Sequence, residues 1–232
     1  MDVNQYALVR GARQTRGALA RWNSDPWPLL RGWVAGASAV AAALLLVVGL
    51  IASVAQPDLT PISIPGITQP PEAGDVLKIL LRNSLVLALH AFACVAGFIA
   101  GSSLPLSAER RTGASRWIHE KARPIAFAWV IAVTCFSLAT QAYALGSTGA
   151  TLAYQLHISI AALLLTVLPH ALPELTAHLL TVAAWTMASR RNEWGSLLAA
   201  TVVTVAIAVP VLVCTALWET YVWPHLLRAV MS

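Results

Sequence analysis

The sequence predicts an all-α fold: a polytopic transmembrane helical bundle with about five spans plus a proline-broken or re-entrant helix. Hydrophobic residues make up 58% of the 232 positions and charged residues only 11%. The mean hydropathy of +0.70 lies outside the range of soluble globular domains. Apolar runs long enough for a spanning helix of about 20 residues occur at residues 33–56, 84–106, 124–146, 151–188 and 194–218.

The positive charges lie in clusters beside these runs. The net charge is +5, and most lysines and arginines fall before residue 32, between residues 110 and 123, or at Arg190 and Arg191. Basic residues on short loops mark the cytoplasmic side and bind anionic lipid headgroups. We therefore expect a multi-pass protein of the bacterial inner (plasma) membrane, with a cytoplasmic N-terminus, that contacts the lipid bilayer and no nucleic acid.

The chain lacks the signatures of an enzyme or a cofactor site. Cys94, Cys135 and Cys214 all fall in apolar runs and form no CxxC pair. There is no Gly-rich phosphate loop and no Gly-x-Ser-x-Gly turn. The spacing His170-x3-Glu174-x3-His178 differs from the HExxH order of metalloproteases. We expect no catalytic residue, no metal and no cofactor.

Three regions follow along the chain. Residues 1–32 are predicted to form a cytoplasmic basic amphipathic arm whose helix lies on the inner membrane surface and ends at Pro26 and Pro28. Residues 33–224 are the transmembrane helical domain, and residues 225–232 are a short tail. The loop at 57–74 has five prolines and no lysine or arginine, so we expect an extended outer segment on the protein or membrane surface.

The second span begins with charged residues. Lys78 and Arg82 lie one turn apart and are expected to reach the outer interface. Asn83 lies deeper, and His90 follows on nearly the same helix face.

Two further features concern packing and turns. Gly97 and Gly101 are spaced for close helix packing, which would also suit a homo-oligomer. A short interfacial helix is expected at 105–123, and the uncharged sequence GSTG at 146–149 is expected to form a tight turn before the next segment.

The segment 152–188 is the most unusual part of the chain. As one straight helix it would measure about 55 Å at 1.5 Å per residue, nearly twice the hydrocarbon thickness. Pro169 and Pro173 are expected to break or kink it. In one topology residues 152–168 are a tilted or re-entrant leg, giving five crossings and an outer C-terminus. In the other, both legs cross and the C-terminus is inside; the basic residues after 188 favour the first topology.

The last two apolar runs contain or end at ionisable residues. Glu174 and His178 would lie one turn apart, with His170 on the same face if the helix continues. The last span contains Pro210 and ends at Glu219 among interface aromatics. An ionisable group at membrane depth is costly and normally has a partner or faces a wet cavity.

Two motifs resemble the stage II sporulation protein M family of bacterial membrane proteins. The sequence PHALPEL at 169–175 resembles that family's His-Gly-x-x-Glu core, with Ala171 in place of the glycine, and LWETYV at 217–222 resembles its closing Ile-Glu-Ala-aromatic end. The resemblance covers roughly residues 83–224. It implies a protein that holds partner proteins at the membrane, with His170, Glu174 and Glu219 at the motif positions.

Two functions follow from these residues. The first is a non-enzymatic membrane scaffold in which His170, Glu174, Glu219 and Asn83 form a polar core, while loops hold an unknown membrane or cell-envelope protein.

The alternative is a small ion or proton channel or transporter. In this hypothesis the broken segment and Glu174 line an ion path together with His90, His157 and His178.

Overall fold

A computed structural model gives the structure of the chain and describes residues 7–99 and 112–231. In these ranges the chain is helical without a β-strand, and five helical stretches are long and apolar enough to cross a membrane. This confirms the predicted all-α transmembrane bundle. The elements are α1 (Ala7–Ser24), α2 (Trp27–Val54), α3 (Ala73–Phe98), α5 (Gly113–Gln155), α6 (Ile160–Arg190), η3 (Trp194–Ser196), α7 (Leu197–Leu217), η4 (Trp218–Val222) and α8 (Trp223–Met231).

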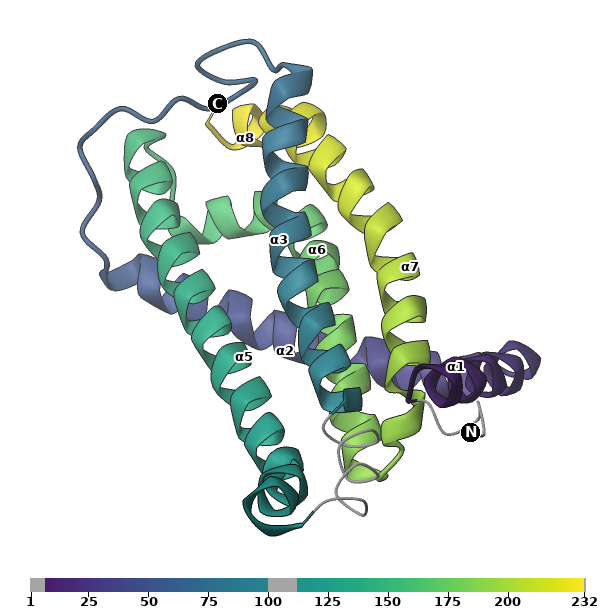
Figure 1. The fold of residues 1–232 in the computed structure, drawn as a ribbon. Helices are drawn as coiled ribbons and strands as arrows, with labels where there is room; N and C mark the ends of the chain where they lie inside the picture. Colours follow the sequence, from purple (N-terminus) through teal and green to yellow (C-terminus); the bar gives the residue numbers. More distant parts are fainter. Residues whose placement is uncertain (1–6, 100–111, 232) are drawn as a thin grey trace.

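The bundle has two distinct ends. Figure 1 shows α3, α5 and α7 running lengthwise, with α2 crossing them obliquely. We call one end the loop end: it carries the segment 57–72, the start of α3 and α8. The other, the arm end, carries α1, η3 and the turn from α6 to α7. The C-terminus therefore lies at the loop end, opposite Arg190 and Arg191, as five crossings require.

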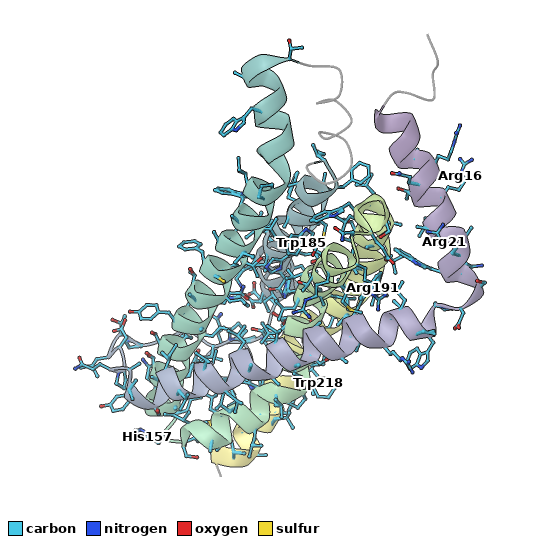
Figure 2. The ribbon with its side chains drawn as sticks, turned by 90° about the horizontal axis from the view of Figure 1, so that it is seen from below. Arg16, Arg21, His157, Trp185, Arg191 and Trp218 are labelled. Atoms are coloured by element: carbon cyan, nitrogen blue, oxygen red, sulfur yellow. The ribbon has the colours of Figure 1, made fainter. Side chains whose placement is uncertain are left out.

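The arm helix α1 packs onto the bundle at the arm end. Ala18 is only 1% exposed, and Gly11 lies against Phe98 and Leu198. Gly195 of η3 lies so close to Gln14 that an added Cβ would come within 3.0 Å of its Oε1. Figure 2 shows Arg16 on α1 pointing away from the bundle. The arm thus docks through its small residues and leaves this basic side chain free to meet lipid headgroups.

The proline-rich loop packs across the loop end. The Gln155 side chain accepts a hydrogen bond from the Ile62 amide (3.0 Å) and donates to the carbonyl oxygens of Asp58 (3.1 Å) and Thr60 (2.8 Å). The Thr60 amide donates to Asp58 Oδ1 (2.9 Å), which holds the pKa of that carboxyl below its usual range. Ile64 is 5% exposed, so the loop is packed against the helices at this end of the bundle.

One turn of this loop has a conformation that favours glycine. Gly66 has a φ of +80° and lies against Pro224, and a Cβ there would come within 2.5 Å of the proline Cγ. Both the positive φ and the close approach exclude a side chain. The loop is therefore fixed against the start of α8.

Two apolar clusters fill the arm half of the bundle. The first joins α2, α5, α6 and α7 through Trp33, Ala37, Ala41, Leu44, Ala142, Leu175, Leu179, Leu180, Ala184 and Ala200. The second joins α3, α5, α6, η3 and α7 through Cys94, Phe98, Val130, Trp185, Ala188, Trp194 and Leu197. Gly97 contributes here because it lies against Trp185 and Leu197; the other predicted packing residue, Gly101, lies outside the described residues.

Of the break or kink predicted at Pro169 and Pro173, the structure shows a kink without a break. Helix α6 runs through both prolines from Ile160 to Arg190, although Figure 1 shows that its axis changes direction along its length. A proline removes one backbone donor and clashes with the carbonyl four residues earlier, which bends a helix. In hydrocarbon the remaining backbone groups have no water to replace their helical bonds, so the helix continues.

The predicted turn at 146–149 is wrong. These residues lie inside α5, and the chain reverses at residues 156–159, where His157 has a φ of 54°. Gly146 instead allows α2 and α5 to approach closely, because an added Cβ would lie 2.6 Å from Ile51 Cγ2. The Ser159 side chain accepts a hydrogen bond from the Ala162 amide and begins α6.

Candidate functional site: a charged cavity near the loop end

A cavity of about 200 Å³ lies between α2, α5, α6 and η4. Its apolar wall comes from three helices and includes Val48, Leu145, Leu163, Leu164 and Val167. Its polar lining consists of Arg82, Thr148, His170, Glu174, Glu219 and Trp223. The structure thus brings together three of the four predicted polar-core residues, His170, Glu174 and Glu219, around one cavity.

The continuous α6 helix supplies two of these side chains. His170 and Glu174 are four residues apart and therefore lie on one face. Leu175, the next residue, lines the cavity and also belongs to the first apolar cluster. The cavity therefore borders the packed core on its arm-end side.

A wide helical turn brings in Glu219 and Trp223. The Trp223 amide donates to the Trp218 carbonyl five residues earlier, so η4 is a π-helix. Pro224 follows, and its ring disfavours a normal α-turn around the carbonyl of Thr220. Glu219 and Trp223 both line the cavity as a result.

The Trp223 indole is fixed by α6. Its Nε1 donates to Thr166 Oγ1 (3.2 Å). Its ring meets the His170 ring edge-on, with centroids 5.9 Å apart. Trp223 is 9% exposed, so it forms a fixed part of the cavity lining.

Arg82 is the cation of this site. It interacts electrostatically with both Glu174 and Glu219. Within the described ranges, no ion pair of 4.0 Å or less joins it to either carboxylate, whereas Lys78 Nζ pairs with Asp75 Oδ1 at 3.2 Å. Three charged side chains therefore converge on the cavity without direct pairing.

Polar neighbours surround the Glu174 carboxylate. The Asn83 amide and the Thr215 hydroxyl lie beside it. Asn83 is 3% exposed, and its Nδ2 has no hydrogen bond of 3.5 Å or less. The Asn83 side chain therefore lies close to the Glu174 carboxylate without a hydrogen bond between them. The fourth predicted polar-core residue thus lies next to the site.

A second cavity of about 210 Å³ adjoins the first on the side of the loop end. We call it the vestibule. Its lining includes Pro65, Asp75 and Lys78, which lie at the loop end. Arg82, Glu219 and Trp223 line both cavities, so the vestibule and the charged cavity meet at these three side chains.

Two of the predicted ion-path histidines form a separate clamp between α3 and α6. His178 Nε2 lies 3.0 Å from the carbonyl oxygen of Asn83, and His90 Nδ1 lies 3.1 Å from that of His178. A carbonyl oxygen only accepts, so each of these ring nitrogens donates, which fixes both tautomers. His90 and His178 are 1% and 3% exposed and do not line the charged cavity.

The remaining predicted ion-path residue lies apart. His157 is exposed in the turn between α5 and α6 and does not line the cavity. The described residues contain no group of three or more His, Cys, Asp or Glu that could hold a metal ion.

Sequence reasoning missed Arg82 and Trp223 as site residues. Arg82 was expected to reach only the outer interface, and Trp223 was one of several interface aromatics. The signal for Arg82 was available: two carboxylates at membrane depth need a positive partner, and Arg82 is the basic residue closest to the start of the second apolar run. Nothing in the sequence indicated that a π-turn would direct Trp223 inward.

Comparisons with known proteins leave the family of the chain open. No protein-family model matches it, and searches of curated proteins and of solved structures found no match. The resemblance to the stage II sporulation protein M family remains a prediction from the motifs at 169–175 and 217–222.

Proposed function

We propose that the chain is a non-enzymatic membrane carrier that binds a small ion or polar solute in the cavity of Glu174, Glu219 and Arg82. One observation carries the proposal. Three charged side chains meet in a cavity that adjoins a vestibule on the side of the loop end, while apolar clusters pack the arm half.

This arrangement fits carriage better than an open channel. Carriers expose a central site to one side of the membrane at a time. Here the two cavities lie near the loop end, and Leu175, Leu179 and Leu180 belong to the packed cluster beyond them. The bend of α6 provides an element whose two parts could move relative to each other when the site opens toward the arm end.

The cellular setting is part of the same proposal. The basic arm and the Arg190–Arg191 pair would face the cytoplasm of a bacterium, and the loop end would face outward. A solute entering through the vestibule would then come from outside. The lipid bilayer is the immediate partner, through the exposed apolar side chains of the helices.

Flux measurements test carriage directly. Purified protein in liposomes is expected to move protons or small ions, and Glu174→Gln is expected to reduce that flux to the level of empty liposomes because it removes one of the two carboxylates. Asp25→Asn, an exposed carboxylate at the arm end, should leave flux unchanged. Absence of flux from well-folded wild type for every ion and solute tried would contradict the proposal.

A scaffold is the second candidate, and the histidine clamp favours it. Reciprocal bonds from His178 and His90 to carbonyls of the facing helices hold α3 and α6 in one register. A rigid bundle could present its loops to an unidentified membrane or cell-envelope protein, or to a second copy of itself. If the wild type shows no flux and Glu174→Gln abolishes cross-linking to such a partner, the scaffold replaces the carrier.

A further inference from the structure

We propose that the charged cavity takes a small organic ammonium ion with an apolar body. The inference rests on the proposed function and names the class of solute for the same site. It is argued from the charges, the walls and the size of the cavity.

The charges favour a cation. Glu174 and Glu219 contribute two carboxylates against one guanidinium from Arg82. When all three are ionised, the cavity carries a net negative charge. The absence of a direct ion pair between Arg82 and either carboxylate, among the residues described, leaves both carboxylates free to accept from another donor.

Polar and aromatic neighbours suit an ammonium group. His170 lines the cavity and is 6% exposed, so its imidazole is a polar part of the cavity wall. The Trp223 indole lies on the same side, and indole rings attract cations across their faces.

The lining of the cavity suits an organic cation better than a metal ion. Calcium takes about six to eight oxygen ligands and magnesium an octahedral set, whereas most of this lining is hydrocarbon. Leu163, Leu164, Val167 and Val48 contribute much of this apolar lining. An ammonium group with an apolar body suits both the charged and the apolar parts of the lining.

The volume of the cavity limits the size of the ligand. An apolar protein cavity of about 150 Å³ holds one benzene molecule. The cavity of about 200 Å³ therefore has room for an aromatic ring with an aminomethyl group, so benzylammonium is a suitable probe.

Equilibrium dialysis with radiolabelled benzylammonium tests the inference on the full chain in lipid nanodiscs. We expect saturable binding to wild type, displaced by excess unlabelled benzylammonium. Benzyl alcohol and benzoate, which have similar shapes but neutral and negative heads, should displace it at least tenfold less well. Equal displacement by benzoate would assign the site to an anion on Arg82 and overturn the inference.

Two variants place the ligand in the cavity from different helices. Glu219→Gln removes a carboxylate, and Leu164→Trp fills the apolar side; each should weaken binding at least tenfold. The matched controls are Asp25→Asn and Leu165→Trp, since Leu165 is the neighbouring residue and is 71% exposed. Gel filtration confirms folding, and if one variant fails to fold the other decides. Unchanged binding in a folded cavity variant would show partition into lipid and overturn the site.

Measurements of binding and of flux test the ligand class and the proposed carrier function separately. Saturable benzylammonium binding with these variant effects, but without flux, would support the ligand class and contradict carriage. Flux of other ions with no benzylammonium binding would support carriage and overturn the ligand class.

Discussion

Replacing Arg82 with glutamine is expected to lower the free energy of unfolding by about 1–2 kcal/mol. Removing one partner of a fully buried charge pair costs about 3–5 kcal/mol, and an exposed pair contributes about 0–1 kcal/mol. Arg82 is exposed and the two glutamates are half-buried, so the effect lies between these limits. The substitution leaves Glu174 and Glu219 facing one cavity without a positive charge. Their mutual repulsion and desolvation are then uncompensated.

The matched control is Lys78→Gln, one turn earlier on α3. The Lys78 side chain is 80% exposed, and an exposed ion pair contributes about 0–1 kcal/mol. Unfolding in detergent should show a larger loss for Arg82→Gln than for Lys78→Gln. Adding Glu219→Gln to Arg82→Gln should restore part of the stability. Equal losses at the two positions, with no restoration, would show that Arg82 is not the partner of the glutamates.

Replacing His178 with alanine is the second large expected effect, about 2–4 kcal/mol of destabilisation. The change empties a buried volume, for which large-to-alanine substitutions cost about 2–5 kcal/mol. It also removes the hydrogen bond to the Asn83 carbonyl, and such bonds between membrane helices contribute about 0.6–2 kcal/mol. His178 is 3% exposed, so the site cannot fill with solvent without opening α3 from α6.

Thermal unfolding in detergent measures this effect beside two comparisons. His178→Phe fills most of the volume without the donor and should retain part of the stability, which separates packing from hydrogen bonding. His225→Ala, an exposed histidine at the loop end, should change little. If His178→Ala unfolds at the wild-type temperature, the clamp between α3 and α6 does not hold the bundle.

The sequence predicts the membrane class and the number of spans because hydrocarbon length and charge placement are strong constraints. It also indicates His170, Glu174 and Glu219, because ionisable residues are rare at that depth. The same reasoning predicts Asn83 as the fourth residue of this polar core.

Several local patterns in the sequence fit more than one structure. Pro169 and Pro173 are compatible with a break or a kink, and α6 is continuous with a kink. Gly146 is suited to a turn or to a close helix contact. In the structure it lies against Ile51 of α2 and makes a close helix contact. His90 and His178 were predicted to line an ion path, yet the structure gives both rings backbone carbonyl partners. Such pairings depend on the register of α3 against α6, which spacing along one helix does not reveal.

The central claim is a charged cavity that opens toward the loop end and is closed toward the arm end. The direct measurement is thiol labelling of Leu164→Cys in a chain whose native cysteines are replaced by serine, with Leu165→Cys as the lipid-facing control. A membrane-impermeant methanethiosulfonate reagent is added to sealed vesicles of each orientation. We predict that residue 164 reacts from the loop end alone and that residue 165 does not react. Reaction of residue 164 from both ends at once would show an open channel, and reaction from neither would show a closed void; each would contradict the account.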